Sequence, residues 1–170
     1  LIQSLVKLSR MESGIIAVHP QKVGTGRLLE AIRQQFAAKA GEKNVTLRVC
    51  DKDLYVTCDP KWTAEALGNI VDNAIKYTPD GGTVQLKMEK YASFVKIDVT
   101  DNGIGIEKEE IPKIFGRFYR SLSAADQPGV GIGLFLAREI IQAQKGYIKV
   151  TSETGKGSTF SVFLPVSKSE

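Results

Sequence analysis

The 170-residue sequence contains a single histidine, His19, and only two cysteines, Cys50 and Cys58. One histidine excludes metal centres and acid–base sites built from several imidazoles. A chain of this size needs no disulfide to bury a core, and the sequence shows no secretory signal, so we expect both thiols to be free. Pairing of the two cysteines across a hairpin stays open. No apolar run approaches the roughly 20 residues that a membrane-spanning helix needs.

Long runs of one charge are also absent. The sequence has 23 basic and 19 acidic residues, which are dispersed along the chain and leave a formal net charge of +4. The sequence has no run of five or six lysines or arginines and so does not indicate a nucleic-acid-binding or membrane-binding tail, and we expect no nucleic-acid partner and no direct membrane contact in this fragment. Hydrophobic residues make up 42% and charged residues 25%, as in a soluble globular domain. The chain begins at Leu1 without a methionine, which predicts a piece of a longer protein.

Hydrophobic periodicity predicts a mixture of helices and strands. Apolar residues at helical spacing end at Gly14, as at the end of a helix. After it we expect a strand at 15–18, a helix at 27–40 that ends at Gly41, and strands at 45–49 and 54–58 joined by a turn at 51–53. A helix at 61–77, capped by Asp59, and a hairpin of strands at 84–88 and 95–101 follow. The remaining expected elements are a short helix at 108–115, a loop, a helix at 132–144, and strands at 147–152 and 159–164. Hairpins in place of strict βαβ units predict an α/β (α+β) two-layer sandwich, with a mixed, mostly antiparallel sheet and helices on one face.

The helix at 61–77 carries an unusual polar face. Asn69, Asn73 and Lys76 stand at i, i+4 and i+7 and so project together. Asparagine and glycine are poor helix formers, yet Gly68, Asn69 and Asn73 all fall within two turns of this helix. This face is either a solvated surface or a binding site. In a binding site, the amide oxygens of the asparagines would coordinate a hard cation and the lysine ammonium would bind anionic oxygens.

Two glycine-rich stretches follow. Asp101 ends a strand and can accept a hydrogen bond from an exocyclic amine such as that of adenine, whereas guanine presents a carbonyl there. Gly103 and Gly105 allow the backbone to approach a flat ring, although a tight turn also fits. The glycines at 129–133 precede a helix, where backbone N–H groups favour phosphate. A Rossmann phosphate loop is excluded there because no strand leads into them.

The order of these motifs closely resembles the catalytic, ATP-binding domain of bacterial sensor histidine kinases, within the GHKL (Bergerat-fold) ATPases. The resemblance runs from about residue 1 to 165. Residues 69–79 resemble the N box, 101–106 the first glycine box, 115–118 the F box and 129–134 the second glycine box. Residues 8–14 resemble the end of the second dimerisation helix. The resemblance therefore implies a helical stub at 1–14 and an ATP-binding catalytic domain at 15–170.

The resemblance implies a set of residues around ATP. Asn73, with Asn69, is expected to hold Mg²⁺, and Lys76 to contact phosphate oxygens, which makes these three the catalytic residues. Arg117 or Arg120 is expected to reach the γ-phosphate from a lid at 116–128. The full expected ATP-binding set is Asn69, Asn73, Lys76, Tyr77, Asp101, Gly103, Gly105, Ile106, Tyr119, Arg120, Gly129, Gly131, Gly133, Leu134 and Thr159, with Thr159 lining the base side. The lid departs from the family pattern: it is short, lacks the usual Thr or Ser before the second glycine box, and has Gly116 inside the F box.

The implied function is that of a protein-histidine kinase in a two-component system, with ATP and Mg²⁺ as cofactors. The implied partners are the dimerisation domain of the same kinase, which forms a homodimer, and indirectly a response regulator. The implied location is cytoplasmic, in the cytosolic part of a membrane-bound kinase. His19 is followed by Pro20 instead of an acidic residue, so we expect the phosphoacceptor histidine to lie elsewhere and this chain alone not to autophosphorylate.

Two rival functions belong to the same superfamily. Hydrolytic GHKL ATPases place a glutamate four residues before the second N-box asparagine, as a base for water, and here that position is Asn69. A non-catalytic switch module, as in anti-sigma proteins, is the second rival. The resemblance of residues 1–14 to a dimerisation helix favours the kinase.

Overall fold

The computed structural model describes residues 2–3, 5–6, 9, 17–116, 119 and 131–167. The described residues between 2 and 9 are helical, as their spacing predicts. Among them Ile2, Leu5 and Val6 are exposed. The expected domain boundary after residue 14 and most of the lid at 116–128 lie outside the described residues.

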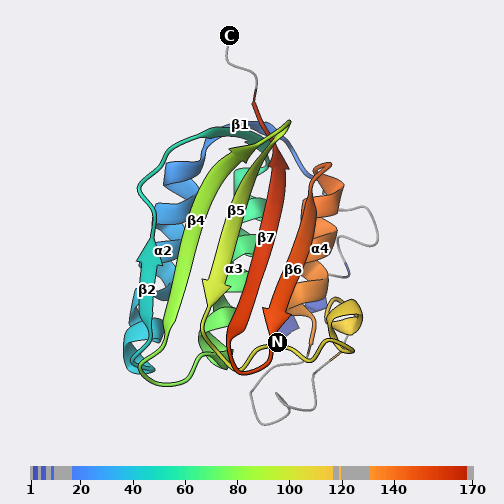
Figure 1. The fold of residues 1–170 in the computed structure, drawn as a ribbon. Coiled ribbons are helices and arrows are strands. Elements are labelled where there is room, and N and C mark those ends of the chain that lie inside the picture. Colours follow the sequence, from blue (N-terminus) through green and yellow to red (C-terminus); the bar gives the residue numbers. More distant parts are fainter. Residues whose placement is uncertain are drawn as a thin grey trace.

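A five-stranded sheet forms one layer of the domain (Figure 1). Its strands are β2 (Thr46–Val49), β4 (Thr83–Tyr91), β5 (Phe94–Asp101), β6 (Tyr147–Glu153) and β7 (Gly157–Pro165). Their order is β2-β4-β5-β7-β6. β2 runs parallel to β4, and the other three neighbouring pairs are antiparallel. The predicted mixed, mostly antiparallel sheet is confirmed, as are its two hairpins, β4–β5 and β6–β7.

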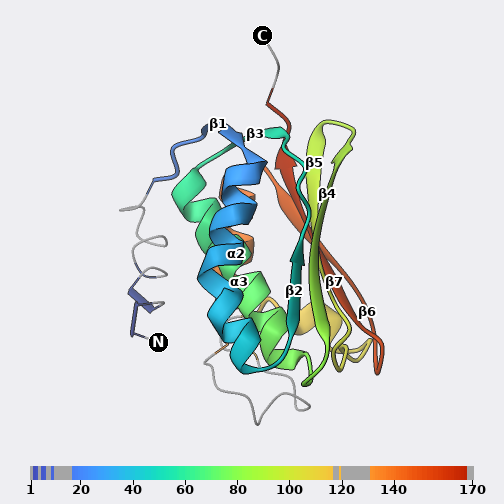
Figure 2. The ribbon, with the colours of Figure 1, turned by 90° about the vertical axis from the view of Figure 1, so that its left-hand side faces the viewer.

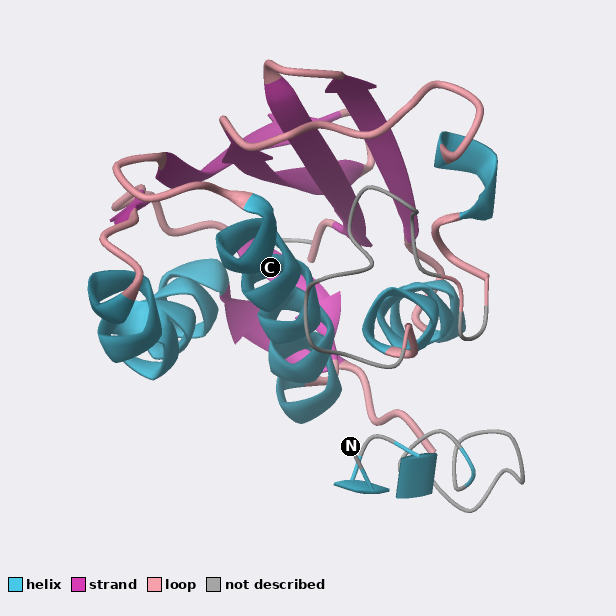
Figure 3. Cartoon of the chain, turned by 90° about the horizontal axis from the view of Figure 1, so that it is seen from below, coloured by secondary structure: helices cyan, strands magenta, loops and turns pink. Residues whose placement is uncertain are grey.

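Three helices form the second layer and cover one face of the sheet (Figure 2). They are α2 (Thr25–Glu42), α3 (Pro60–Tyr77) and α4 (Gly133–Ala143). Seen from below, the helices lie together on one side of the strands (Figure 3). Alternate residues of β5, Val95, Ile97 and Val99, are buried against this layer, because side chains of a strand point to opposite faces in turn. The two-layer sandwich is confirmed.

α3 begins and packs as its sequence predicts. The Asp59 carboxylate accepts a hydrogen bond from the backbone N–H of Trp62 at 3.1 Å, and Pro60 occupies the first helical position. The apolar stripe of this helix is buried, with no residue in it more than 2% exposed: Leu67, Ile70, Val71 and Ala74. The opposite, polar face of the same helix is thereby oriented away from the core.

The structure corrects the expected strand pairing near the N-terminus. Residues 17–20 lie outside any strand, and residues 15 and 16 are not among the described residues. The first strand in the described part of the chain is β1 (Gln21–Gly24), which pairs with β3 (Tyr55–Cys58) in a separate two-stranded sheet. The runs at 45–49 and 54–58 therefore form no hairpin, because β2 belongs to the large sheet. Alternation marks a strand but does not identify its partner. Both cysteines are free, as expected.

Two helix predictions are also corrected. α2 continues past Gly41 to Glu42, and the chain turns at Asn44, which has a φ of 57°. Asparagine tolerates this left-handed conformation and ends the helix where glycine was expected to. The segment at 108–115 contains only a short 3₁₀ helix, η1 (Ile111–Lys113), because Pro112 removes a backbone donor from what would be a helix interior.

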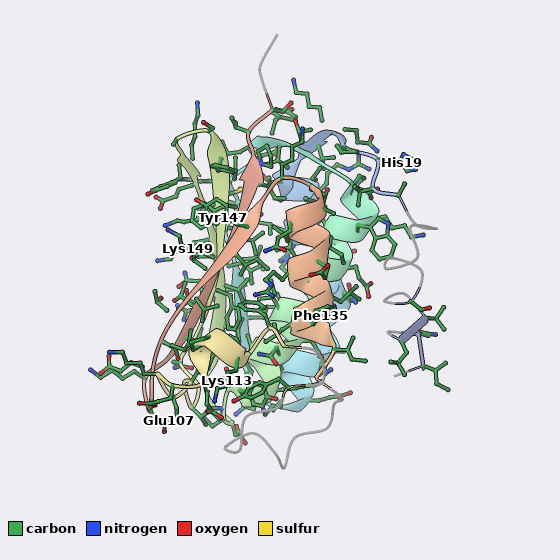
Figure 4. The ribbon with its side chains drawn as sticks, turned by 90° about the vertical axis from the view of Figure 1, so that its right-hand side faces the viewer. His19, Glu107, Lys113, Phe135, Tyr147 and Lys149 are labelled. Atoms are coloured by element: carbon green, nitrogen blue, oxygen red, sulfur yellow. The ribbon has the colours of Figure 1, made fainter. Side chains whose placement is uncertain are left out.

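The face of the sheet away from the helices carries polar and aromatic side chains. Tyr147 stacks on Phe163 with ring centroids 4.2 Å apart, and the Lys149 ammonium lies 5.8 Å from the Tyr147 centroid (Figure 4). Thr100 and Thr159 lie on this same face, with their hydroxyls 3.0 Å apart. None of the helices in the described part of the chain combines the length and apolar character that a bilayer-crossing helix needs.

Candidate functional site

Asp101, the last residue of β5, is a buried carboxylate at one end of the sheet. Only 8% of the residue is exposed. Its Oδ1 accepts a hydrogen bond from the Gly103 N–H at 2.9 Å, and the backbone of Ser158, its partner on β7, also donates to the carboxylate. Burial raises the pKa of Asp101, while these two donors oppose that rise by stabilising the ionised form. The result is a pre-oriented acceptor facing the helix layer.

The loop after Asp101 is pressed against the end of α3. Ile104 N–H donates to the carbonyl of Tyr77 at 3.2 Å. A Cβ added to Gly103 would come under 3.0 Å from that same carbonyl, a distance that real Cβ atoms do not show. Gly103 therefore permits a contact that no other residue allows, and this contact brings Tyr77 and Asp101 to one place.

The same loop is held on its other side by the turn between β6 and β7. Gly105 has a φ of 76°, and a Cβ there would lie under 3.0 Å from the carbonyl of Glu153. Gly155 N–H donates to Ile104 O at 2.8 Å, and Ile106 N–H donates to Ser152 Oγ at 2.8 Å. The first glycine box is thus held between α3 and the β6–β7 turn.

The polar face of α3 meets the beginning of α4. Asn69 Nδ2 donates to the carbonyl of Gly133 at 3.1 Å, across 64 positions of sequence. Asn69 and Asn73 are partly buried, and Leu134 follows Gly133 in the first turn of α4. Gly131, just before the helix, has a φ of 75°. The structure therefore joins the N box to the end of the second glycine box.

Two lysines lie at the carboxyl-terminal end of α3. Lys76 Nζ is 3.0 Å from Asp72 Oδ2 on the preceding turn of the helix. The ammonium of Lys43, at the end of α2, donates to the carbonyls of Ile75 and Lys76. Burial lowers the pKa of Lys43. These contacts fix the last turn of α3, whose final carbonyl holds the loop after Asp101.

Asn69 and Asn73 suit a metal cation only if other oxygen atoms, such as those of a phosphate, complete its coordination. The described residues include no group of three or more His, Cys, Asp or Glu side chains that could hold a metal. Because Asn69 Nδ2 is bound to Gly133, its Oδ1 is the atom left for a ligand, and the side chain of Asn73 makes no hydrogen bond within the described part of the chain. Amide oxygens alone bind Mg²⁺ poorly, but they complete a site in which phosphate oxygens are the main ligands.

Not every expected site residue joins this group. Thr159 lies on the outer face of the sheet, where its hydroxyl contacts that of Thr100, so the structure does not place it beside Asp101. Tyr119 packs against the core, and its hydroxyl donates to Glu110 Oε1 at 2.8 Å. Arg117, Arg120 and Gly129 lie outside the described residues.

Ser158, and not Thr159, lies beside Asp101 on the helix-facing side of β7. Ser158 is 7% exposed and pairs with Asp101 in the sheet register. Its Oγ lies 2.7 Å from that of Ser152, which also donates to the carbonyl of Gly157. The sequence contained the signal: Phe160, Val162 and Leu164 alternate as buried residues of β7, so an even-numbered residue points toward the helices.

Comparisons with known proteins identify the family. The family model described as "Histidine kinase-, DNA gyrase B-, and HSP90-like ATPase" matches residues 58–168, more than half of the chain. The chain is 32% identical to sensor protein kinase PmrB of Pseudomonas aeruginosa over 97% of its own length and 35% of that protein. It is 34% identical to sensor histidine kinase WalK of Bacillus subtilis over 97% of its length and 28% of that protein.

Solved structures agree with these matches. The catalytic domain of histidine kinase ThkA superposes with a TM-score of 0.75 at 25% identity, over 87% of this chain and 96% of that one. The chain spans about a third of the length of the curated relatives it matches. With the N box, the first glycine box and the start of α4 brought together at one end of the sandwich, these matches show that the chain belongs to the histidine kinase-, DNA gyrase B- and HSP90-like ATPases and is an ATP-binding domain of that family.

Proposed function

We propose that this chain is the catalytic domain of a two-component sensor histidine kinase, which binds Mg-ATP and donates its γ-phosphate to a histidine on the dimerisation domain of the same protein. The observation that carries the proposal is the meeting of Asp101, the polar face of α3 and the first residues of α4 at one end of the fold. A response regulator would then receive the phosphoryl group from that histidine.

Asp101 binds the adenine end of the nucleotide. Its carboxylate has two backbone donors already bound and accepts a further N–H from the exocyclic amine of adenine. Tyr77, Gly103, Gly105 and Ile106 surround this position through the contacts of the glycine loop. The carbonyl of guanine would face the carboxylate as a second acceptor, so this end of the site selects adenine.

Asn69, Asn73 and Lys76 act on the phosphates. Lys76 supplies a positive charge, and the two asparagine amides hold Mg²⁺ together with phosphate oxygens. Bound Mg²⁺ neutralises phosphate charge. Catalysis of phosphoryl transfer consists mainly of positioning and charge stabilisation, which is what this set of side chains supplies. The backbone N–H groups of Gly131, Gly133 and Leu134 at the start of α4 favour the same negative charge.

His19 is far from this site. Its backbone N–H donates to Asp59 Oδ2, at the amino-terminal end of α3. The phosphate-binding Lys76 is close to the opposite end of that 18-residue helix, and a helix of this length spans about 27 Å. Figure 4 shows His19 at the end of the molecule opposite to Glu107, in the segment that follows the glycine loop. The acceptor histidine therefore comes from a separate domain.

The test is transfer to a separately prepared dimerisation domain of the same kinase. The chain is mixed with that domain and with ATP labelled on the γ-phosphate, and acid-labile phosphohistidine is measured. We expect label on the dimerisation domain and none on this chain, and Asn73→Ala should abolish the transfer. Asn73→Ala should also remove the Mg²⁺-dependent part of ATP binding in calorimetry.

Steady release of inorganic phosphate without phosphohistidine would contradict the kinase proposal and favour a hydrolytic ATPase. ATP binding with neither release nor transfer would favour a switch module. Asn69 stands where a hydrolytic enzyme of this superfamily places its glutamate, and its amide is bound to Gly133, so we expect no steady hydrolysis.

A further inference from the structure

Asp72 on α3 is shared by two lysines. Its Oδ2 lies 3.0 Å from Lys76 Nζ, and its Oδ1 contacts the ammonium of Lys39 on α2. The carboxylate and Lys76 are each about a quarter exposed, and Lys39 is about half exposed. Each ammonium binds a different oxygen, so the three groups form a triad with a net charge of +1.

This triad lies beside the proposed phosphate position. Asp72 is adjacent in sequence to Asn73 and one helical turn from both Asn69 and Lys76. If Lys76 alone compensated Asp72, moving this ammonium toward ATP would leave a bare carboxylate next to a polyphosphate. Like charges at this distance repel appreciably at the intermediate dielectric of a protein surface.

We propose that Lys39 is a positioning residue for phosphate binding: it neutralises Asp72 from the α2 side, so that Lys76 can transfer from Asp72 to the phosphates of ATP. Asp72 then orients Lys76 before the nucleotide arrives and stays compensated afterwards. This inference rests on the proposed function, because it assigns a second cation to the same phosphate end. Lys39 itself does not need to contact ATP.

A different role is possible for the same contact, in which Lys39 only ties α2 to α3. Exposed ion pairs of this kind add little stability, typically below about 1 kcal/mol. A purely structural tie would affect every ligand of the domain equally. The electrostatic role affects only ligands that carry phosphate, and this difference makes the two separable.

The experiment measures dissociation constants of Mg-ATP and of adenosine for the 170-residue chain at low ionic strength. The variants are Lys39→Met, Lys39→Arg, Asp72→Asn and the double variant Lys39→Met with Asp72→Asn. Lys90→Met is the matched control, because it also replaces an exposed lysine, but one far from the site. Lys90 lies near one end of β4, whereas Val84, which pairs with Asp101, lies near the other end. Thermal unfolding of each variant reports on folding.

We expect Lys39→Met to weaken Mg-ATP binding about 3- to 10-fold and to leave adenosine binding unchanged. At high salt the variant and the unmodified chain should bind Mg-ATP equally, because salt screens the charge of Lys39. Lys39→Arg should restore binding, and Lys39→Met should have little effect when Asp72 is already asparagine, because the pair then no longer couples. Lys90→Met should bind Mg-ATP like the unmodified chain.

Unchanged ATP affinity in Lys39→Met, equal weakening of ATP and adenosine, or an undiminished effect in the Asp72→Asn background would each overturn the inference. The proposed function fails separately: it requires that the unmodified chain bind Mg-ATP and that Lys76→Met weaken that binding. If those two results hold while Lys39→Met has no effect, only the role of Lys39 is rejected.

Discussion

Asp101 is a buried residue whose carboxylate charge the proposed contact with adenine requires. Burial favours its protonated form, whereas the backbone donors at Gly103 and Ser158 favour the carboxylate. The ionised carboxylate accepts a hydrogen bond from an adenine amine more strongly than the protonated acid does. If Asp101 binds adenine as we propose, protonation of this one residue couples the affinity for ATP to pH.

We predict that ATP affinity falls as the pH decreases through the raised pKa of Asp101, at a pH above that at which exposed aspartates titrate. Folding responds in the opposite direction: a raised native pKa adds stability at low pH, and this contribution is lost as the pH rises through that pKa. Calorimetric titration with ATP from about pH 8 down to about pH 4 measures the first effect, and urea unfolding over the same range measures the second.

Asp101→Asn should abolish both pH dependences and lower ATP affinity at least about tenfold, with the fold retained. The asparagine NH₂ must face either a backbone donor or the adenine amine, and either arrangement sets two donors against each other. Tight, pH-independent ATP binding by this variant would show that the adenine amine is recognised elsewhere.

Ser158 and Thr159 are neighbours in sequence on opposite faces of β7. We predict that Ser158→Val weakens ATP binding several-fold, because it removes the hydroxyl that lies beside Asp101 and contacts Ser152. Thr159→Val, which loses only the contact with Thr100, serves as the matched control and should bind ATP normally. The reverse result, measured by the same titration, would restore Thr159 to the site.

At the scale of elements, the glycine loop depends on contacts with two other parts of the chain. Gly103 packs against the carbonyl of Tyr77 at the end of α3, and Gly105 packs against the carbonyl of Glu153 at the β6–β7 turn. Gly155, in that turn, also has a positive φ, 82°, but nothing lies within 4 Å of the position its Cβ would take. The two glycines at 105 and 155 therefore share a conformation and differ in their surroundings.

We predict that Gly155→Ala costs about 1–2 kcal/mol of unfolding free energy, the conformational cost of a left-handed alanine. Gly105→Ala should cost clearly more and should also weaken ATP binding, because its methyl group would displace the carbonyl of Glu153. Urea unfolding and ATP titration of the two variants separate strain from steric clash. Equal losses in both would show that the contact with Glu153 relaxes freely.

At the scale of the whole molecule, the proposed site for ATP combines elements that are distant in sequence. It would contact α3, the loop after β5 and the start of α4, so binding should stabilise the folded chain as a unit. We predict that Mg-ATP at about 100 times its dissociation constant adds about 2.7 kcal/mol of stability, which raises the melting temperature by about 5–10 °C.

Mg-GTP at the same concentration should leave the melting temperature unchanged within about 1 °C, since its carbonyl would face the carboxylate of Asp101. The measurement is a thermal melt of the chain with each nucleotide, and Asp101→Asn should reduce the shift that ATP produces to about half or less, since a tenfold loss of affinity leaves about 1.4 kcal/mol of stabilisation. An equal shift with GTP would show that the phosphates, and not the base, dominate recognition.

Local sequence determined most of the elements and the chemistry of the site. The alternation at 84–99, the Asp59 cap and Pro60 of α3, and the i, i+4, i+7 spacing of Asn69, Asn73 and Lys76 are short-range patterns, and each has the predicted conformation. The motif order was enough to predict the two-layer fold and the family. The elements depend on residues within a few positions of one another, so they can be inferred along the chain, whereas the family was inferred from the order of motifs spread over it.

Tertiary structure alone decided the features that depend on distant partners. The separation of β2 from β3, the pairing of Ser158 with Asp101, and the ion triad of Lys39, Asp72 and Lys76 join positions tens of residues apart. The registers of those contacts follow from how the two layers pack, because a shift of one residue moves a side chain to the other face of a strand. Periodicity thus determined where most of the helices and strands lie, the order of the motifs indicated which residues to expect around ATP, and packing determined which of those residues meet.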